Sequence, residues 1–134
     1  MIKLRNMLLI SLMLMVFVSC GENRQPSGIK PEKEGPVLFP VKIAGKYGYI
    51  DKLGNLIIET QFDYALAFYE GLAAVRVGDE KQGKWGYIDK SGKYVIAPQF
   101  DGAESFSGGL AMVRIGDKQG YIDKEGTWVW KPSR

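Results

Sequence analysis

Five aspartates at repeated places in the chain are the residues whose type and spacing most resemble a catalytic set. They are Asp51, Asp63, Asp89, Asp101 and Asp123. Paired carboxylates can hydrolyse glycosides, one acting as the acid and the other as the nucleophile or base. An active site is normally built once, whereas a turn is needed in every repeated segment. We therefore predict that Asp51, Asp89 and Asp123 are structural turn residues and that the chain is not an enzyme.

The composition removes several other mechanisms. The 134 residues include no histidine and one cysteine, Cys20, which excludes Ser-His, Cys-His and His-ligated metal chemistry and an intramolecular disulfide within this chain. The segment from Gly86 to Gly92 resembles a phosphate-binding loop, but its glycines are one residue too far apart, and Tyr94 stands where Ser or Thr would hold Mg²⁺. The sequence predicts no catalytic residue, no metal site and no cofactor.

Aromatic side chains are the remaining candidates for a functional surface. Trp128 and Trp130 alternate along the last predicted strand and would share one face. Tyr47, Trp85 and Gln119 occupy one position of a repeat, and the variation there indicates partial exposure. Two alternatives stay open: the aromatics close the core or cover a sheet edge, or they form a platform for a glycan or peptide. The candidate binding surface is Tyr47, Trp85, Trp128 and Trp130.

An internal repeat positions these residues. The pattern Lys-x-Gly-Tyr-Ile-Asp-Lys-x-Gly occurs at 46–54, 84–92 and 118–126. Downstream, the segment 61–63 matches 99–101, and the segment 41–43 matches 113–115. The strand that the last copy lacks therefore stands at the front of the repeat region. The sequence predicts a β domain at 37–134 with three modules in permuted register, near 37–63, 72–101 and 110–132.

Each module is predicted to contain three strands, nine in total. Alternation along 85–89 favours a strand, and the following Asp-Lys-x-Gly is typical of a tight hairpin in which glycine takes a positive φ. The predicted structural turn residues are Asp51, Gly54, Asp89, Gly92, Asp123 and Gly126. The longer corners at 63–69 and 101–107 have room for a helical turn. The predicted fold is all-β, with antiparallel β-meander repeats that form a curved sheet, a small barrel or a sandwich.

The isoleucine of each motif, Ile50, Ile88 or Ile122, is predicted to lie in the core. The tyrosine before it, Tyr49, Tyr87 or Tyr121, is expected to have a structural packing role because it recurs in every copy. The middle copy, 84–92, together with 96–101 and 106–113, resembles the WG-repeat (KWG-repeat) family, and the resemblance covers about 41–132. Only this copy keeps Trp-Gly. The resemblance implies a bacterial, often exported, repeated β-module, and it implies no catalytic or ligand residues.

The first 36 residues are predicted to be an export signal and a tether. Lys3 and Arg5 precede an apolar run at 7–18, and Val18-Ser19-Cys20-Gly21 resembles a bacterial lipobox. The run would span about 18 Å as a helix, short of a bilayer core of about 30 Å, so a cleaved signal is favoured over a membrane-spanning helix. We expect residues 1–19 to be a lipoprotein signal peptide, Cys20 to be lipidated, and residues 20–36 to include a flexible tether.

Charge argues against nucleic acid as the partner. The chain has 18 Lys and Arg against 15 Asp and Glu, and removal of the signal peptide leaves 16 basic side chains. We expect a membrane-anchored, non-catalytic binding or scaffold protein of the bacterial cell envelope, on the outer membrane or cell surface if the organism is Gram-negative. Its partner would be a protein or an envelope glycan. The alternative is a carbohydrate- or peptidoglycan-binding module that uses exposed aromatics.

Overall fold

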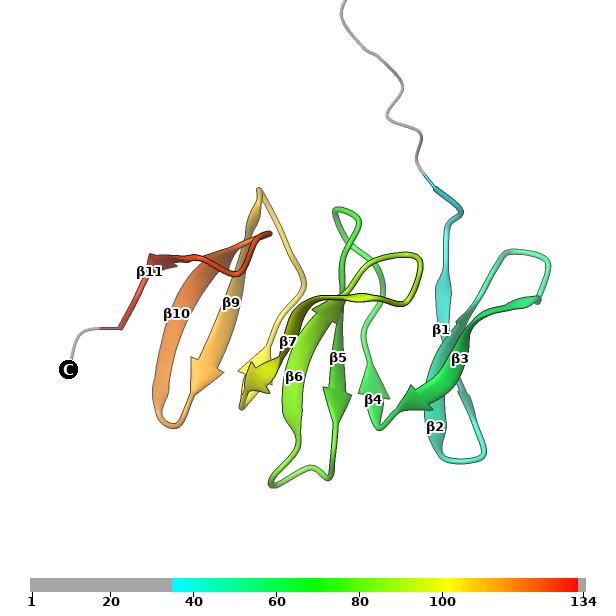
Figure 1. Cartoon of the computed structure of the whole chain (residues 1–134), viewed down its shortest axis with the longest axis horizontal. Helices are drawn as coiled ribbons and strands as arrows, with labels where there is room; N and C mark the ends of the chain where they lie inside the picture. Colours follow the sequence, from blue (N-terminus) through cyan, green and yellow to red (C-terminus); the bar gives the residue numbers. More distant parts are fainter. Residues whose placement is uncertain (1–34, 133–134) are drawn as a thin grey trace, which may run out of the picture. The chain divides into compact units, whose positions relative to one another are not determined.

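Alternating apolar residues and glycine-containing turns fold the chain into short strands joined by hairpins (Figure 1). The computed structural model describes residues 35–132. Its strands are β1 (Phe39–Ile43), β2 (Lys46–Ile50), β3 (Leu56–Phe62), β4 (Tyr64–Ala65), β5 (Ala73–Val77), β6 (Lys84–Ile88), β7 (Tyr94–Phe100), β8 (Gly102–Ala103), β9 (Leu110–Ile115), β10 (Lys118–Asp123) and β11 (Trp128–Trp130). No helix occurs in the described range. The two-residue strands β4 and β8 raise the number above the predicted nine, and they lie in the corners that had room for a helical turn.

The strands form three antiparallel sheets that follow the order of the chain. The sheets are β1-β2-β3, β4-β5-β6-β7 and β8-β9-β10-β11, so every strand pairs with its neighbour in sequence. Figure 1 shows the second sheet between the other two. The prediction of all-β meander repeats is confirmed. The small barrel left open by the sequence does not form between residues 35 and 132, because the three sheets remain separate.

The strand β1 has the same place in the first sheet that β5 and β9 have in the second and third. Each of these strands pairs with the strand that carries the motif glycine. The equivalent pairs are Val41 with Gly48, Val75 with Gly86 and Val113 with Gly120. Residues ahead of the first motif therefore supply the first sheet with this strand.

The apolar core lies at the two junctions between successive sheets. The first cluster contains Leu38, Tyr49, Ile58, Phe62, Ala65, Ala73, Val75 and Ile88. The second contains Leu72, Ala74, Tyr87, Ile96, Phe100, Phe106, Ala111, Val113 and Ile122. Because side chains alternate along a strand, Tyr87 joins the second cluster and Ile88 the first. The middle sheet is thus apolar on both faces and needs a neighbour on each side.

The two outer sheets show where this stacking ends. Ile50 of the first copy is only half-buried, whereas Ile88 and Ile122 are fully buried. Tyr121 of the third copy is 43% exposed, whereas Tyr49 and Tyr87 are fully buried. The core prediction therefore holds for Ile88 and Ile122 but not for Ile50, and Tyr121 is not packed as Tyr49 and Tyr87 are. For Tyr121, the reason is that no further sheet follows the third one among the described residues.

The motif glycine allows a neighbouring strand to cross close to it. Gly86 is buried, and a Cβ atom there would lie 2.6 Å from the carbonyl oxygen of Ile96 and 2.7 Å from the nitrogen of Pro98. The pairing of β6 with β7 shifts register at this point, which brings the β7 backbone over the glycine. A Cβ atom at Gly48 would likewise meet the β3 backbone, and one at Gly120 would meet the Trp128 ring at 2.5 Å and the carbonyl oxygen of Trp130 at 2.7 Å.

Candidate functional site

Asp89 and its equivalents organise the hairpin turns. One carboxylate oxygen of Asp89 accepts hydrogen bonds from the backbone N–H groups of Ser91 and Lys93, at 2.9 and 3.1 Å. Gly92 completes the turn with φ of 85°, a conformation that other residues adopt at a cost. The same two bonds and the same glycine conformation, with φ of 85° and 83°, occur at Asp51 with Gly54 and at Asp123 with Gly126.

Hydrogen bonds to the carboxylates of Asp51 and Asp89 favour their ionised form. The side chain of Asn55 lowers the pKa of Asp51, and the side chain of Ser91 lowers the pKa of Asp89, with further contributions from the turn N–H groups. A general acid that works at neutral pH needs the opposite shift. The geometry and the pKa directions both describe turn residues.

Asp101 and Asp63 link successive sheets, a role that the sequence analysis missed. Asp101 follows β7 and accepts hydrogen bonds from the Lys84 side chain in the second sheet and, at 2.7 Å, from the backbone N–H of Gly116 in the third. These bonds, the one from Gly116 foremost, lower the pKa of Asp101. Asp63 is bound in the same way by Lys46, at 2.6 Å, and by the backbone of Gly78, at 2.8 Å. The sequence signal for this link was that the motif lysine recurs together with the Gln-Phe-Asp segment at 61–63 and 99–101.

Two of the four predicted surface aromatics, Tyr47 and Trp85, lie in one row with Tyr64. The ring centroid of Tyr64 lies 5.2 Å from that of Tyr47 and 5.8 Å from that of Trp85. The Arg76 guanidinium lies over the rings of Tyr64 and Trp85, at 5.6 and 5.9 Å from their centroids. Tyr64 and Arg76 were not identified from the sequence.

The other two predicted surface residues lie apart from that row. Trp128 packs edge-on against Phe100 with ring centroids 6.1 Å apart, and it borders the second core cluster. Trp130 is 56% exposed. Among residues 35–132, no aromatic contact joins Trp128 or Trp130 to Tyr47, Tyr64 or Trp85. Among the described residues, ring contacts join Tyr47 and Trp85 through Tyr64, and a binding surface made of all four residues stays a prediction.

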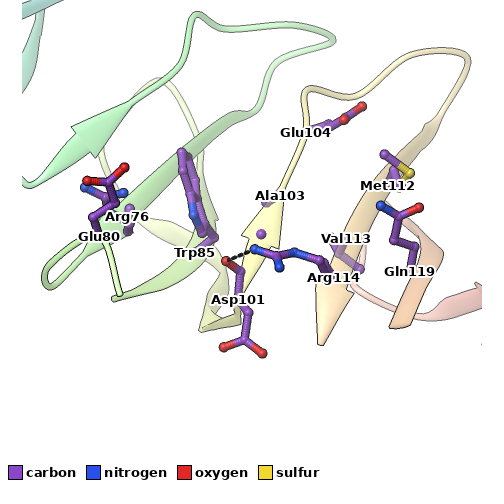
Figure 2. Close-up of a pocket in the computed structure, with 11 residues that line it drawn as sticks. Arg76, Glu80, Trp85, Asp101, Ala103, Glu104, Met112, Val113, Arg114 and Gln119 are labelled. Carbon is purple, nitrogen blue, oxygen red and sulfur yellow. Dashed lines mark hydrogen bonds between the residues drawn. The ribbon is translucent and has the colours of Figure 1, made fainter. Parts of the chain in front are cut away.

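A groove of about 430 Å³ lies beside Trp85, between the second and third sheets (Figure 2). Gly102 and Glu104 border it along and after β8, and Arg114 and Gln119 border it from β9 and β10. Figure 2 shows Trp85 on one side of Ala103 and the Arg114 side chain reaching toward Asp101. An aromatic wall with cationic, anionic and amide groups is suited to binding a ligand by stacking and a few hydrogen bonds.

The guanidinium groups of the two groove arginines make few hydrogen bonds. Within the described range, the Arg76 side chain has no ion pair and no hydrogen bond, and its buried Nε has no partner. Arg114 donates through Nη2 to the carbonyl oxygen of Asp101 at 3.4 Å, a long bond. Both guanidinium groups keep N–H donors available to a ligand.

Residues 35–132 lack two features, a metal-binding cluster and a membrane-spanning helix. No group of three or more His, Cys, Asp or Glu side chains is placed to hold a metal ion there. In the same range, no helix has the length and apolar character needed to cross a membrane. The predicted signal peptide, the lipidation site Cys20 and nearly all of the tether lie outside the described residues.

Comparison with known proteins gives one match. The family model described as "WG containing repeat" matches residues 47–80 and 85–118, just over half of the chain. No curated protein and no solved structure matches. Each matched segment starts in a motif strand and ends after the first strands of the next sheet, so the family unit spans a junction between sheets.

Proposed function

The chain belongs to the family of proteins that contain WG repeats, and we propose that it is a non-catalytic binding or scaffold protein of the bacterial cell envelope. The groove at the second junction is the observation that carries the binding role. Trp85 offers an aromatic face there, beside the guanidinium groups of Arg76 and Arg114 and the amide of Gln119. A concave site with one stacking wall and a few convergent polar groups is typical of ligand recognition.

The placement of the acidic residues supports binding over catalysis. Asp51, Asp89 and Asp123 accept hydrogen bonds from their own turns. Asp63 and Asp101 hold successive sheets together. The pKa values of Asp51, Asp63, Asp89 and Asp101 are lowered, which makes these four carboxyl groups poor general acids. The repeated acids thus have structural work in every module.

A protein partner is tested with envelope extracts passed over the full-length chain, followed by mass spectrometry of what is retained. Trp85→Leu removes the stacking face and keeps an apolar side chain, and Trp130→Ala is the matched control on an exposed tryptophan. We expect the wild type and Trp130→Ala to retain an envelope protein that Trp85→Leu does not retain. A chemical turnover of an envelope component would contradict the non-catalytic role, and equal retention by both variants would contradict binding at the groove.

Membrane attachment through Cys20 is the second part of the proposal, and its support is the lipobox-like sequence at 18–21. A single acyl chain holds a protein only marginally, so anchoring requires the several chains of a bacterial lipoprotein. Cys20→Ala should move the protein from the detergent-soluble membrane fraction to a soluble or unprocessed form, while Ser27→Ala should leave it in place. Unchanged partitioning, with no lipid mass on the wild-type N-terminal peptide, would contradict the anchor.

The alternative function is carbohydrate or peptidoglycan binding. The specific observation in its favour is the pair of accessible indole rings, Trp85 at the groove and Trp130, which is 56% exposed. Sugar rings stack on such faces, and the polar groups around Trp85 offer hydrogen bonds to hydroxyls. Co-sedimentation with purified peptidoglycan, abolished by Trp85→Leu, would favour this alternative over a protein partner.

A further inference from the structure

The two junctions between sheets are built alike, and Tyr64 fills the first of them. Tyr64 in β4 pairs with Arg76 in β5. Its ring lies against Tyr47 on the first sheet and Trp85 on the second, with the Arg76 guanidinium over its face. A phenol ring is thus held by aromatic contacts and a cation–π contact in this position.

Gly102 takes the place of Tyr64 at the second junction. Gly102 in β8 pairs with Arg114 in β9. Tyr64 and Gly102 each stand in an Asp-x-Ala sequence, at 63–65 and 101–103. Trp85 takes the place of Tyr47 there, and Gln119 takes the place of Trp85. The chain provides no ring at this position, and the groove of about 430 Å³ lies between these walls.

The glycine at 102 is not needed by the backbone. Its φ is not positive, and it lies in a paired strand where any residue is allowed. A Cβ atom there would meet Nε of Arg114 at 3.1 Å and Nη2 at 3.5 Å, which belong to the far end of a flexible side chain. The Arg114 side chain therefore borders the place where a side chain at 102 would begin, and a shift of its guanidinium would admit a ring.

We infer that the groove beside Gly102 is the docking site for an aromatic side chain of a partner protein, whose ring takes the position that Tyr64 takes at the first junction. The inference rests on the proposed function, because it names the chemistry of that partner. Trp85 supplies the stacking face and Arg114 the cation.

The charges around the groove favour a neutral ring. Two guanidinium groups, on Arg76 and Arg114, stand among the carboxylates of Glu80, Asp101 and Glu104, and Asp101 is also bound by Lys84. No single sign dominates, so a phosphate or another strong anion would be poorly selected. The equivalent walls of the first junction hold a phenol, which favours an aromatic side chain over a sugar.

The test uses the full chain with Cys20→Ala, so that no lipid is attached, and observes it by ¹⁵N NMR. The probes are acetyl-tyrosine amide and acetyl-phenylalanine amide, with acetyl-leucine amide as the apolar control and N-acetylglucosamine oligomers as the sugar control. We expect the aromatic amides to cause saturable shifts of the Trp85 indole N–H and the Gln119 side-chain amide. The Trp130 indole serves as an internal reference on the same spectra.

Two variants exchange the residues of the two junctions. Gly102→Tyr places the chain's own ring in the groove and should weaken binding of the aromatic amides by roughly tenfold or more. Tyr64→Gly should open the first junction and create a second saturable site, reported by the Trp85 indole and by the backbone N–H of Tyr47. The new site in Tyr64→Gly can be measured whether or not Gly102→Tyr folds. Thermal melts of both variants are recorded beside the titrations.

Three results would overturn the inference: equal shifts from the leucine amide, unaltered binding by Gly102→Tyr, or shifts of the groove from the sugars alone. An envelope protein retained equally by the wild type and Gly102→Tyr would also overturn it and would leave the proposed function standing. The converse result, aromatic amides bound in the groove without any retained envelope protein, would support the inference and count against the proposed function.

Discussion

The hydroxyl of Tyr87 in β6 donates a hydrogen bond of 2.7 Å to the carbonyl oxygen of Glu104, just after β8 in the third sheet. Tyr49 makes the same bond, also of 2.7 Å, to the carbonyl oxygen of Leu66 at the first junction. Burial raises the pKa of both phenols far above the usual range, so each stays a neutral donor. The motif tyrosine thus joins its own sheet to the next one.

Removal of this bond should weaken the junction. Tyr87→Phe keeps the buried ring but leaves the Glu104 carbonyl without its donor, and it should lower the free energy of unfolding by about 1–2 kcal/mol. Tyr121→Phe is the matched control, because Tyr121 is 43% exposed, and it should have almost no effect. Urea unfolding of the two variants measures both values. Equal losses would show that the hydroxyl of Tyr87 does not stabilise the junction.

Gly92 and Gly54 separate the cost of backbone strain from the cost of a steric clash. Both have φ of 85°, but a Cβ atom at Gly92 would lie 3.2 Å from Cγ2 of the buried Ile58, whereas Gly54 has open space. Gly54→Val should cost about 1–2 kcal/mol for the left-handed backbone alone. Gly92→Val should cost more, since it also disturbs the first core cluster. A Gly92→Val melt that matched the wild type would mean that the turn is wrongly described.

The leading strand β1 should be required for stability. It pairs along its whole length with β2, and the adjacent Leu38 is only 3% exposed, within the first core cluster. A chain that begins at Lys46 should unfold at a lower urea concentration than one that begins at Gly35. Its free energy of unfolding should be lower by several kcal/mol, because loss of Leu38 alone costs about 2–5 kcal/mol. Circular dichroism follows the transition. The same sharp transition in both chains would show that β1 is dispensable.

Acid should destabilise the fold through its structural aspartates. The pKa values of Asp51, Asp63, Asp89 and Asp101 are lowered in the folded state. Their unfolded values lie near about 3.9, so their contribution is complete above about pH 5 and is lost as the pH falls through the lower folded values. The free energy of unfolding should thus be flat from neutral pH to about pH 5 and decrease below about pH 4. The free energy of unfolding of Asp101→Asn should decrease less steeply in acid than that of the wild type. Equal slopes would contradict the stabilising role of the Asp101 carboxylate.

Much of the fold could be predicted from local patterns. Period-two alternation and the Asp-Lys-x-Gly turns predict the strands and hairpins of each module, because these features depend on neighbours in sequence. The two-residue strands β4 and β8 could not be predicted, since each is defined only by pairing with a later strand.

The candidate site was harder to predict, because it depends on how modules meet. Trp128 and Trp130 were expected on one face, but the pairing of β10 with β11 shifts register between Tyr121 and Ile122, and simple alternation does not reveal such a shift. The difference between Tyr64 and Gly102 is visible when the repeats are aligned. The structural consequence of this difference is visible only in the fold, where the Tyr64 ring lies between those of Tyr47 and Trp85.

The most direct test of a docking site at this groove is photo-crosslinking of the full chain in its native host cells. A benzophenone amino acid at position 119 borders the groove, and one at position 57, on the exposed Ile57 of β3, is the control. The account predicts a protein adduct from position 119 that is missing from position 57 and is lost when Gly102→Tyr is added. Adducts of equal yield at the two positions, or an adduct at 119 that persists with Gly102→Tyr, would contradict it.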